Sequence, residues 1–225
     1  MHLLLETITD RQTQRLEEAA THAVSAVLHR QRRRLEDMGI EEAAKRPESE
    51  WGTDKDEMAA ALYLLLRRPW DDSFELFTAS RGIVTRPQDR DRLYGDWAGG
   101  YSERIGGGIV NTNRDVVIRL AAKVAAGETL PANPLRVLST TDRAIGIGIT
   151  ETTSGITAGE TSGAEMYRRE TGRLLLPYWL TENDERVCKI CGPLDNQPST
   201  FWRHRFAWGP PAHPRCRCRL EWRDV

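Results

Sequence analysis

The stretch CKICGPLDNQPSTFWRHRFAWGPPAHPRCRC, residues 188–218, contains all four cysteines of this 225-residue chain. They form two close pairs, Cys188 with Cys191 and Cys216 with Cys218, and His213 stands just before the second pair. A CxxC turn brings two sulfur atoms close together, and alternate residues of a strand point to the same face. Four thiolates so arranged suit the tetrahedral coordination that zinc prefers. The stretch therefore predicts a structural zinc site with the four cysteines as ligands.

Other interpretations of the cysteines remain open. His213 is a fifth donor for four coordination positions. It either replaces a cysteine such as Cys218 or lies outside the coordination sphere and orients one of the ligands. Disulfides between the two pairs are an alternative, because a protein that leaves the cell meets an oxidising environment. Thiol redox catalysis is less favoured, since Gly192-Pro193 follows the CxxC where a helix N-terminus would lower the pKa of a thiol. The last alternative is that the cysteines are free thiols and bind no metal.

The charge of the chain is balanced. Lys and Arg together number 32 and Asp and Glu number 33, which gives a net charge of −1. Such a balance produces no long-range attraction to nucleic acid or anionic lipid, so a contact of that kind depends on a local patch. The hydrophobic content of 39% is enough for a buried core.

The sequence also indicates where the chain matures. No stretch reaches the roughly 20 apolar residues of a membrane-spanning helix. The N-terminus, MHLLLETITD, lacks the charged region and the longer apolar core of a secretory signal. We therefore expect no membrane partner and maturation in the cytoplasm, where thiols stay reduced and a cysteine cluster more often holds a metal.

The first part of the chain has helical periodicity. Residues 10–38 repeat apolar side chains at helical spacing, with Thr9 or Asp10 as the cap. Residues 53–68 predict a second, well-buried helix, which we expect Pro69 to terminate because proline removes a backbone donor and clashes with the preceding turn.

Glycines weaken the helices expected further along. Residues 88–103 predict a third helix, the glycine run 106–108 predicts a loop or hinge, and residues 112–127 predict a clear fourth helix. In residues 139–172 we expect one or two helices, since each interior glycine costs about 1 kcal/mol relative to alanine. Small residues at such spacing can let another helix approach closely, and a kinked, packed helix is the plainest interpretation.

Prolines in LPANP mark a boundary near residue 131. We divide the chain there into a helical docking region, 1–130, and a second region, 131–225, which ends in a cysteine-rich tail, 174–225. The tail predicts a strand at 174–180 and another in RCRCRLEW, where one face carries Cys216, Cys218, Leu220 and Trp222. The expected fold class is α+β and mainly helical, with a helical N-terminal region followed by a small cysteine-rich C-terminal module that contains β-structure.

A locally basic run lies within the first helix. It contains Arg30, Arg32, Arg33 and Arg34. The simplest interpretation is that these arginines form a solvated helix face. The functional alternative is that they contact DNA or an acidic surface of a partner.

The sequence contains no positive sign of catalysis. No Ser/His/Asp or Cys/His set stands out. His204 and His213 lie near cysteines, as in zinc-supported nucleases, but no paired His-Asn arrangement on a strand and helix accompanies them. We therefore predict that the protein is not an enzyme.

Residues 135–223 carry a recognisable signature. It consists of Trp179, Asp184, Arg186, Val187, Cys188, Cys191, Leu194, Asp195, Pro210, Pro211, His213, Pro214, Cys216, Arg217 and Cys218. The stretch resembles the C-terminal part of phage head morphogenesis proteins, the phage Mu F-like minor head proteins. Upstream, residues 142–152 look like a helical segment of that family. Where the family usually has a glycine after Leu-Asp, this chain has Asn196, which tolerates the left-handed backbone of a turn.

The resemblance implies a structural role. Such proteins are minor components of tailed-phage heads, and they associate with the portal and with the major capsid protein or scaffold during assembly. The implied locations are the virion head and, during assembly, the host cytoplasm. A part in DNA packaging or ejection is also implied, and the four arginines of the first helix are then candidate contacts to packaged DNA.

Two other functions compete with this one. The first is a zinc-stabilised nucleic-acid-binding module, favoured by arginines and tryptophans that alternate in the tail, among them Trp202, Arg203, Arg205 and Trp208. The second is an enzyme or toxin, because related modules are fused to effector domains in other chains. No catalytic constellation supports the second.

Overall fold

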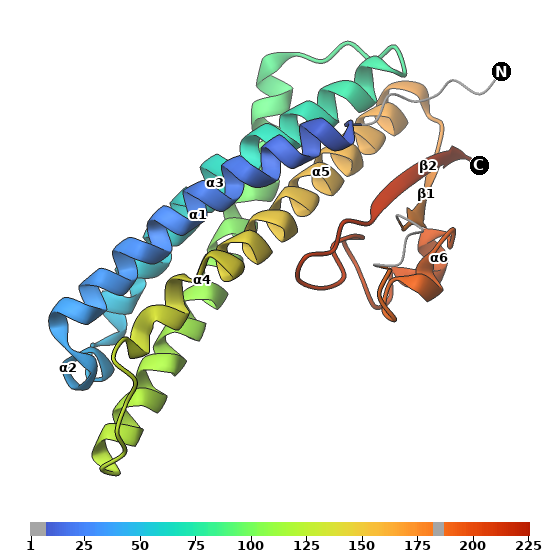
Figure 1. Ribbon diagram of the computed structural model, residues 1–225. Helices are drawn as coiled ribbons and strands as arrows, with labels where there is room; N and C mark the ends of the chain where they lie inside the picture. The colour runs from blue at the N-terminus through green and yellow to red at the C-terminus, as the bar shows by residue number, and fades with distance from the viewer. Residues whose placement is uncertain (1–7, 182–186) are drawn as a thin grey trace.

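A computed structural model describes residues 8–181 and 187–225 (Figure 1). Its elements are α1 (Asp10–Met38), α2 (Ile40–Ala44), α3 (Glu48–Ala79), α4 (Pro87–Ala125), η1 (Pro134–Ser139), α5 (Thr141–Thr171), β1 (Leu175–Leu180), η2 (Gly192–Leu194), α6 (Ser199–Trp202) and β2 (Arg219–Asp224). Long helices run side by side as an elongated bundle, and a small module with the cysteines lies beside α5. The predicted fold class is confirmed.

Helix α1 begins and ends where the sequence predicts. The Thr9 hydroxyl accepts a hydrogen bond from the Gln12 backbone N–H at 3.3 Å, and the Gln12 side chain accepts one from the Thr9 N–H at 3.0 Å. This reciprocal pair satisfies two backbone donors at the helix start. Gly39, at φ 83°, ends the helix. The face toward the core carries fully buried Val24, Leu28 and Leu35.

Helix α3 continues through Pro69, so the predicted termination there is wrong. The proline ring faces α5, where a Cβ built on Gly155 would lie 2.9 Å from its Cγ. Trp70 and Phe74 follow directly and stack with ring centroids 4.8 Å apart in the core. A proline inside a helix costs about 3 kcal/mol or more, and burial of these large rings offsets that cost.

Helix α4 is one element where the sequence predicted two helices and a loop. The loop or hinge predicted at 106–108 is wrong, because all three glycines are helical. Gly106 is buried against α3, and a Cβ there would lie 2.8 Å from the backbone nitrogen of Ala59. Close contact between α4 and α3 therefore requires a glycine at this position and outweighs its low helix propensity.

Helix α5 is also a single helix, and four of its five glycines face α1 or α3. A Cβ on Gly148 would lie 2.8 Å from the Thr21 nitrogen of α1, and a Cβ on Gly163 would lie 2.7 Å from Phe77 Cδ1 of α3. Gly159 makes an equally close approach to α3. The expectation that small residues let a neighbouring helix approach closely is confirmed.

The main core fills the bundle. It joins side chains from α1, α3 and α4 with three from beyond residue 131, namely Leu135, Leu138 and Ala144. Residues on both sides of the predicted division thus share one core, and the division into regions 1–130 and 131–225 stays a prediction.

The C-terminal module, residues 175–225, is built on a two-stranded antiparallel sheet. Trp179 of β1 lies opposite Leu220 of β2. Strand β1 confirms the strand predicted at 174–180. Strand β2 begins at Arg219, so Cys216 and Cys218 lie in the loop before it, and their predicted place on a strand is wrong.

The loop of residues 209–218, called the docking loop below, holds the module against α5. The Thr153 hydroxyl donates a hydrogen bond to the carbonyl oxygen of Cys216 at 2.8 Å. The Arg215 N–H donates to the Thr150 hydroxyl at 2.9 Å. Two hydroxyls on one face of α5 therefore bind the backbone that carries the second cysteine pair.

The module also contacts α1 and α3. The Arg217 guanidinium donates two hydrogen bonds to the Glu17 carboxylate of α1, at 3.0 and 2.9 Å. The rings of Trp222 and Phe77 of α3 meet edge to face with centroids 5.7 Å apart. Such a bidentate ion pair fixes orientation as well as distance, so the module has a defined position on the bundle.

Candidate metal centre

The first cysteine pair occupies a tight turn. The Gly192 N–H donates to the Cys188 carbonyl at 2.9 Å, and the Cys191 N–H points at Cys188 Sγ at 3.4 Å. Cys191 is buried, whereas Cys188 is half-buried. The turn therefore directs both sulfur atoms to one side, as the CxxC spacing predicted.

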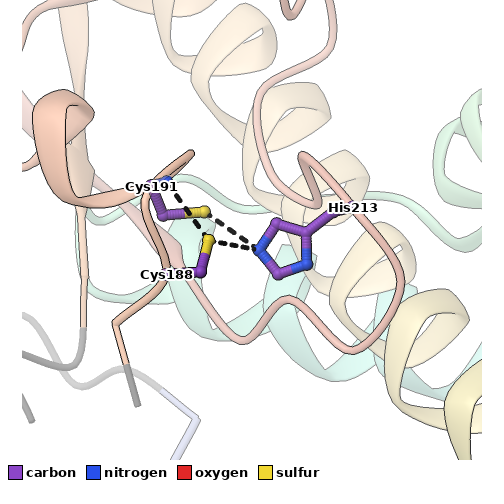
Figure 2. A group of neighbouring side chains, drawn as sticks. All are labelled: Cys188, Cys191 and His213. Carbon is purple, nitrogen blue, oxygen red and sulfur yellow. Dashed lines mark hydrogen bonds between the residues drawn. The ribbon is translucent and has the colours of Figure 1, made fainter. Parts of the chain in front are cut away.

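His213 reaches into this pair from the docking loop (Figure 2). Its Nε2 atom lies 3.0 Å from Cys188 Sγ and 3.3 Å from Cys191 Sγ. Its Nδ1 atom lies 2.8 Å from the carbonyl oxygen of Pro214. A carbonyl can only accept, so Nδ1 donates to it and Nε2 is the ring nitrogen that faces the sulfurs. Metal-binding histidines are oriented in this way.

The second pair meets the first at Cys191. The Sγ atoms of Cys191 and Cys216 are 3.8 Å apart. The sulfurs of Cys191, Cys216 and Cys218 all lie within 4.8 Å of one another, as do the donors of Cys188, Cys191 and His213. Two sulfurs at ~2.3 Å from a tetrahedral zinc ion are about 3.8 Å apart. The geometry therefore fits a metal such as zinc.

Electrostatics at the cluster also favour a cation. Hydrogen bonds with the neighbouring thiols lower the pKa of Cys216, while the one with Cys216 raises the pKa of Cys191. Burial lowers the pKa of His213, but its bond to the Pro214 carbonyl and the nearby cysteines outweigh this and raise it. Closely packed thiols cannot all lose their protons, because the resulting thiolate charges repel one another. A bound metal ion balances these charges and takes the place of the protons.

An aromatic core supports the donors. Trp179 and Trp202 are fully buried and meet edge to face, with ring centroids 5.5 Å apart. Cys191, Cys216 and Cys218 pack against these rings. The donor atoms are therefore held by packed side chains.

The four predicted cysteines and His213 thus converge on one cluster. All four cysteines are free thiols, without a disulfide between them. Which four of the five donors bind a metal stays a prediction. His213 lies 3.3 Å from Cys191 Sγ, closer than Cys216 at 3.8 Å.

Other signature residues shape the same module. The Asp195 carboxylate accepts hydrogen bonds from the backbone and hydroxyl of Thr181, both at 2.9 Å. Asn196 has φ 55°, so it adopts the left-handed backbone expected where the family has glycine. Asp184 and Arg186 lie outside the described residues.

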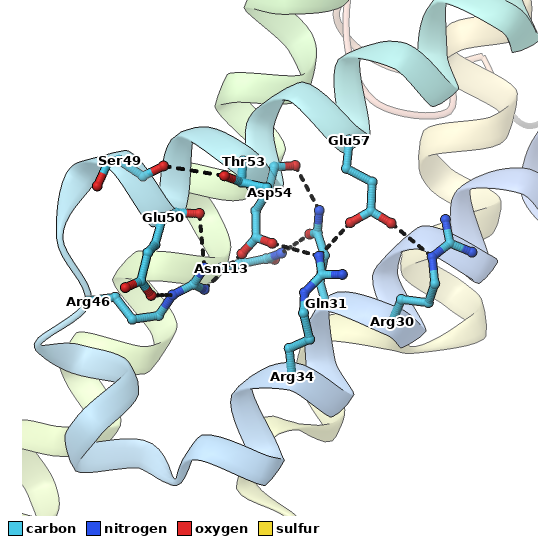
Figure 3. Close-up of polar contacts among 10 residues, drawn as sticks. All are labelled: Arg30, Gln31, Arg34, Arg46, Ser49, Glu50, Thr53, Asp54, Glu57 and Asn113. Atoms are coloured by element: carbon cyan, nitrogen blue, oxygen red, sulfur yellow. Dashed lines mark hydrogen bonds and ion pairs between the residues drawn. The ribbon is translucent and has the colours of Figure 1, made fainter.

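The basic run of α1 takes part in ion pairs (Figure 3). Arg34 binds Asp54 at 2.6 Å and also contacts Glu57, while Arg30 binds Glu57 at 2.8 Å. Arg32 pairs with Glu36 at 3.7 Å. These acids neutralise much of the run, and its contact with DNA stays a prediction. His204 is exposed and is not part of the metal cluster.

Sequence reasoning missed two features near the module. Trp97, Tyr101 and Arg104 of α4 line a cleft beside it, and their spacing of four and then three residues, typical of one helix face, is the signal that could have found them. The contact of Arg217 with Glu17 joins positions 200 residues apart, and no local pattern indicates it.

Comparison with known proteins gave no match. No family model matches the sequence, and neither a curated protein nor a solved structure matches the chain. Across residues 8–181 and 187–225, no helix has both the length and the apolar character needed to cross a membrane. The similarity to phage Mu F-like head proteins therefore stays a prediction from the residues that carry it.

Proposed function

We propose that this chain is a minor structural protein of a tailed-phage or phage-like head, which associates with the portal and with the capsid protein or scaffold during assembly. The observation that carries the proposal is the ordered signature around the cysteines. Its cysteines and His213 meet in one cluster, and Trp179 and Leu194 belong to the core beneath it. Residues shared with that family thus have a common structural purpose in this chain.

We infer that the cluster holds one zinc ion through Cys188, Cys191, Cys216 and either Cys218 or His213. Zinc supplies no redox chemistry, and in a closed site of thiolates and imidazole it stabilises the fold. The ligands tie the 188–191 turn to the docking loop in a module with few buried aliphatic side chains. A structural metal adds folding free energy where a small core is insufficient.

Metal analysis tests the zinc site. Purified under reducing conditions, the chain is expected to contain about one zinc ion. The double variant Cys188→Ser with Cys216→Ser removes two donors and is expected to lose the metal. His204→Ala is the matched control, since that histidine lies outside the cluster. A double variant that keeps full zinc content contradicts the site.

The zinc affinity of single variants identifies the fourth ligand. If His213 is the ligand, His213→Ala weakens zinc binding more than Cys218→Ser, and the reverse holds if Cys218 is the ligand. Loss of a ligand is expected to lower the affinity by tenfold or more. Zinc competition with a chromophoric chelator gives both affinities.

Particle assembly tests the role in the head. The chain, co-expressed with the portal, capsid and scaffold proteins of its own particle, is expected to co-purify with portal-bearing particles and to cross-link to the portal. The cysteine double variant is expected to be incorporated less, whereas His204→Ala is incorporated normally. Portal-bearing particles that lack the wild-type chain contradict the proposal.

A further inference from the structure

A large cleft lies between α4 and the C-terminal module, beside the contacts that hold the module on α5. It has a volume of about 1080 Å³ and is lined by α4, α5 and the segment 202–214. Sites for drug-sized ligands measure roughly 300–1,000 Å³, so the cleft is slightly larger than that range. No residue of the metal cluster other than His213 contributes to its lining.

The wall formed by α4 is aromatic and basic. Trp97 and Tyr101 stack with ring centroids 4.9 Å apart and planes inclined by 28°. One turn further on, the Arg104 guanidinium lies 5.3 Å from the centre of the Tyr101 ring. The wall thus presents flat rings beside a positive charge.

The facing wall repeats these features on the module. Trp208 is 73% exposed, so its ring is available for contact with a ligand. Arg203 and Arg205 flank the same segment, and Arg205 lies 5.2 Å from the centre of the Phe206 ring. Both walls therefore combine aromatic surface with arginine.

The arginines of the cleft carry uncompensated charge. In the part of the chain that the structure describes, Arg104, Arg203 and Arg205 form no ion pair, in contrast to Arg30 and Arg34 on α1. Of the acids that line the cleft, Glu165 is already bound to Arg168 and Arg169. Asp96, which is exposed, adds one negative charge to the lining.

The third acid that lines the cleft, Glu151, is buried. Its carboxylate accepts a hydrogen bond from the Tyr101 hydroxyl at 2.8 Å. Burial raises the pKa of Glu151 to about 7, so much of its charge is absent at neutral pH. The balance of charge in the cleft is therefore positive near its arginines.

We propose that this cleft binds single-stranded nucleic acid, with bases stacked on Trp97 and Trp208 and phosphates bound by Arg104, Arg203 and Arg205. Stacking surfaces alternating with arginines recognise unpaired bases and their backbone with little dependence on sequence. A duplex hides its base faces, so its bases cannot stack on the aromatic walls of the cleft. The site needs α4 as well as the module, and it does not depend on a role in head assembly.

Binding of a labelled oligothymidylate to the full zinc-loaded chain tests the proposal by fluorescence anisotropy. Wild type is expected to bind saturably, more tightly at low salt, and more tightly than it binds a duplex of the same length. Arg203→Ala with Arg205→Ala, and separately Trp208→Ala, are expected to weaken binding roughly fivefold to a hundredfold. All three side chains are exposed, so folding is retained.

The matched control is Arg15→Ala with Arg119→Ala. It removes two exposed arginines that lie away from the cleft and are not ion-paired within the described part of the chain, and wild-type affinity is expected. Equal loss in the control and cleft variants would overturn the proposal. So would equal binding of single and double strands, absence of saturable binding, or preference for a labelled acidic peptide, which would mark the cleft as a protein-binding site.

Discussion

Glu160 combines a buried position with an ionisable group. It lies on α5 and is buried, near Arg219 of the module and Arg81 in the turn that follows α3. Burial raises its pKa from the ordinary 4.5 to about 7, and the neighbouring Trp222 indole and the two arginines offset this only in part. The side chain is therefore neutral in the folded protein at mildly acidic pH.

The shifted pKa of Glu160 makes stability depend on pH. Between pH 4.5 and 7 the folded chain keeps a proton that the unfolded chain releases, so the free energy of unfolding falls as pH rises through this window. Glu160→Gln removes this term. We expect the variant to be more stable than wild type at pH 8, by on the order of 3 kcal/mol, and similar to it near pH 5. Urea unfolding across this range measures the difference.

Glu165 is the matched control, because it lies on the same helix with the opposite shift. Hydrogen bonds from Arg168 lower its pKa to about 2. The stability that it contributes is complete above its unfolded-state pKa and is lost only in strong acid. Glu165→Gln is therefore expected to give no gain at pH 8. If both variants show the same pH profile as wild type, Glu160 is not the source of the dependence.

The metal donors were predictable residue by residue because their spacing is local. A CxxC turn brings its sulfurs together whatever surrounds it, and the structure confirms that all four cysteines and His213 converge. The contribution of His213 relative to Cys218 could not be predicted, because it depends on how the docking loop folds back. That path is set by Thr150 and Thr153 on α5.

The glycines of α5 determine how closely helices pack. A Cβ on Gly159 would overlap the backbone of Trp70 and the Ser73 side chain on α3. The helix backbone cannot move away cheaply, so Gly159→Ala is expected to lower the free energy of unfolding by about 1–3 kcal/mol. Thermal and urea unfolding measure the loss.

Gly108→Ala provides the control on α4. Gly108 is helical and exposed, and no atom lies within 4 Å of a Cβ built there. Without a steric penalty, alanine is expected to raise stability by up to about 1 kcal/mol through its higher helix propensity. A Gly159→Ala protein that is as stable as the Gly108→Ala protein would show that α5 does not need a small residue at this contact.

Helix boundaries followed from the sequence only where a local signal decides them. The capping box at Thr9 and Gly39 give both ends of α1. Pro69 and the glycines at 106–108 gave false ends, because their propensities are outweighed by contacts with α5 and α3 that no local pattern contains. Gly106 illustrates the point, since its neighbour Ala59 lies on a different helix.

For the molecule as a whole, the docking loop links metal binding to the position of the module. The loop supplies His213, Cys216 and Cys218, and it also carries Arg215 and Arg217, which bind α5 and α1. We expect chelation of the metal to release the loop, to increase trypsin cleavage after the two arginines and to lower the melting temperature. Each kcal/mol lost corresponds to about 2–4 °C in a chain of this size.

The bundle itself is expected to survive chelation, because its core contains none of the metal donors. Far-ultraviolet circular dichroism should therefore retain most of the helical signal. The Cys188→Ser with Cys216→Ser variant is the control, and the chelator should leave its cleavage pattern unchanged. Identical cleavage of wild type before and after chelation would show that metal binding does not hold the docking loop in place.

The length of α4 has a mechanical consequence. The helix passes the module at Arg104 and continues to Ala125. At 1.5 Å per residue, this extension projects about 30 Å beyond the cleft. A partner gripping the far tip and another seated at the module would be held apart at a fixed spacing. The bundle would then behave as a rigid strut, transmitting a push or a twist at one end to whatever is fastened at the other.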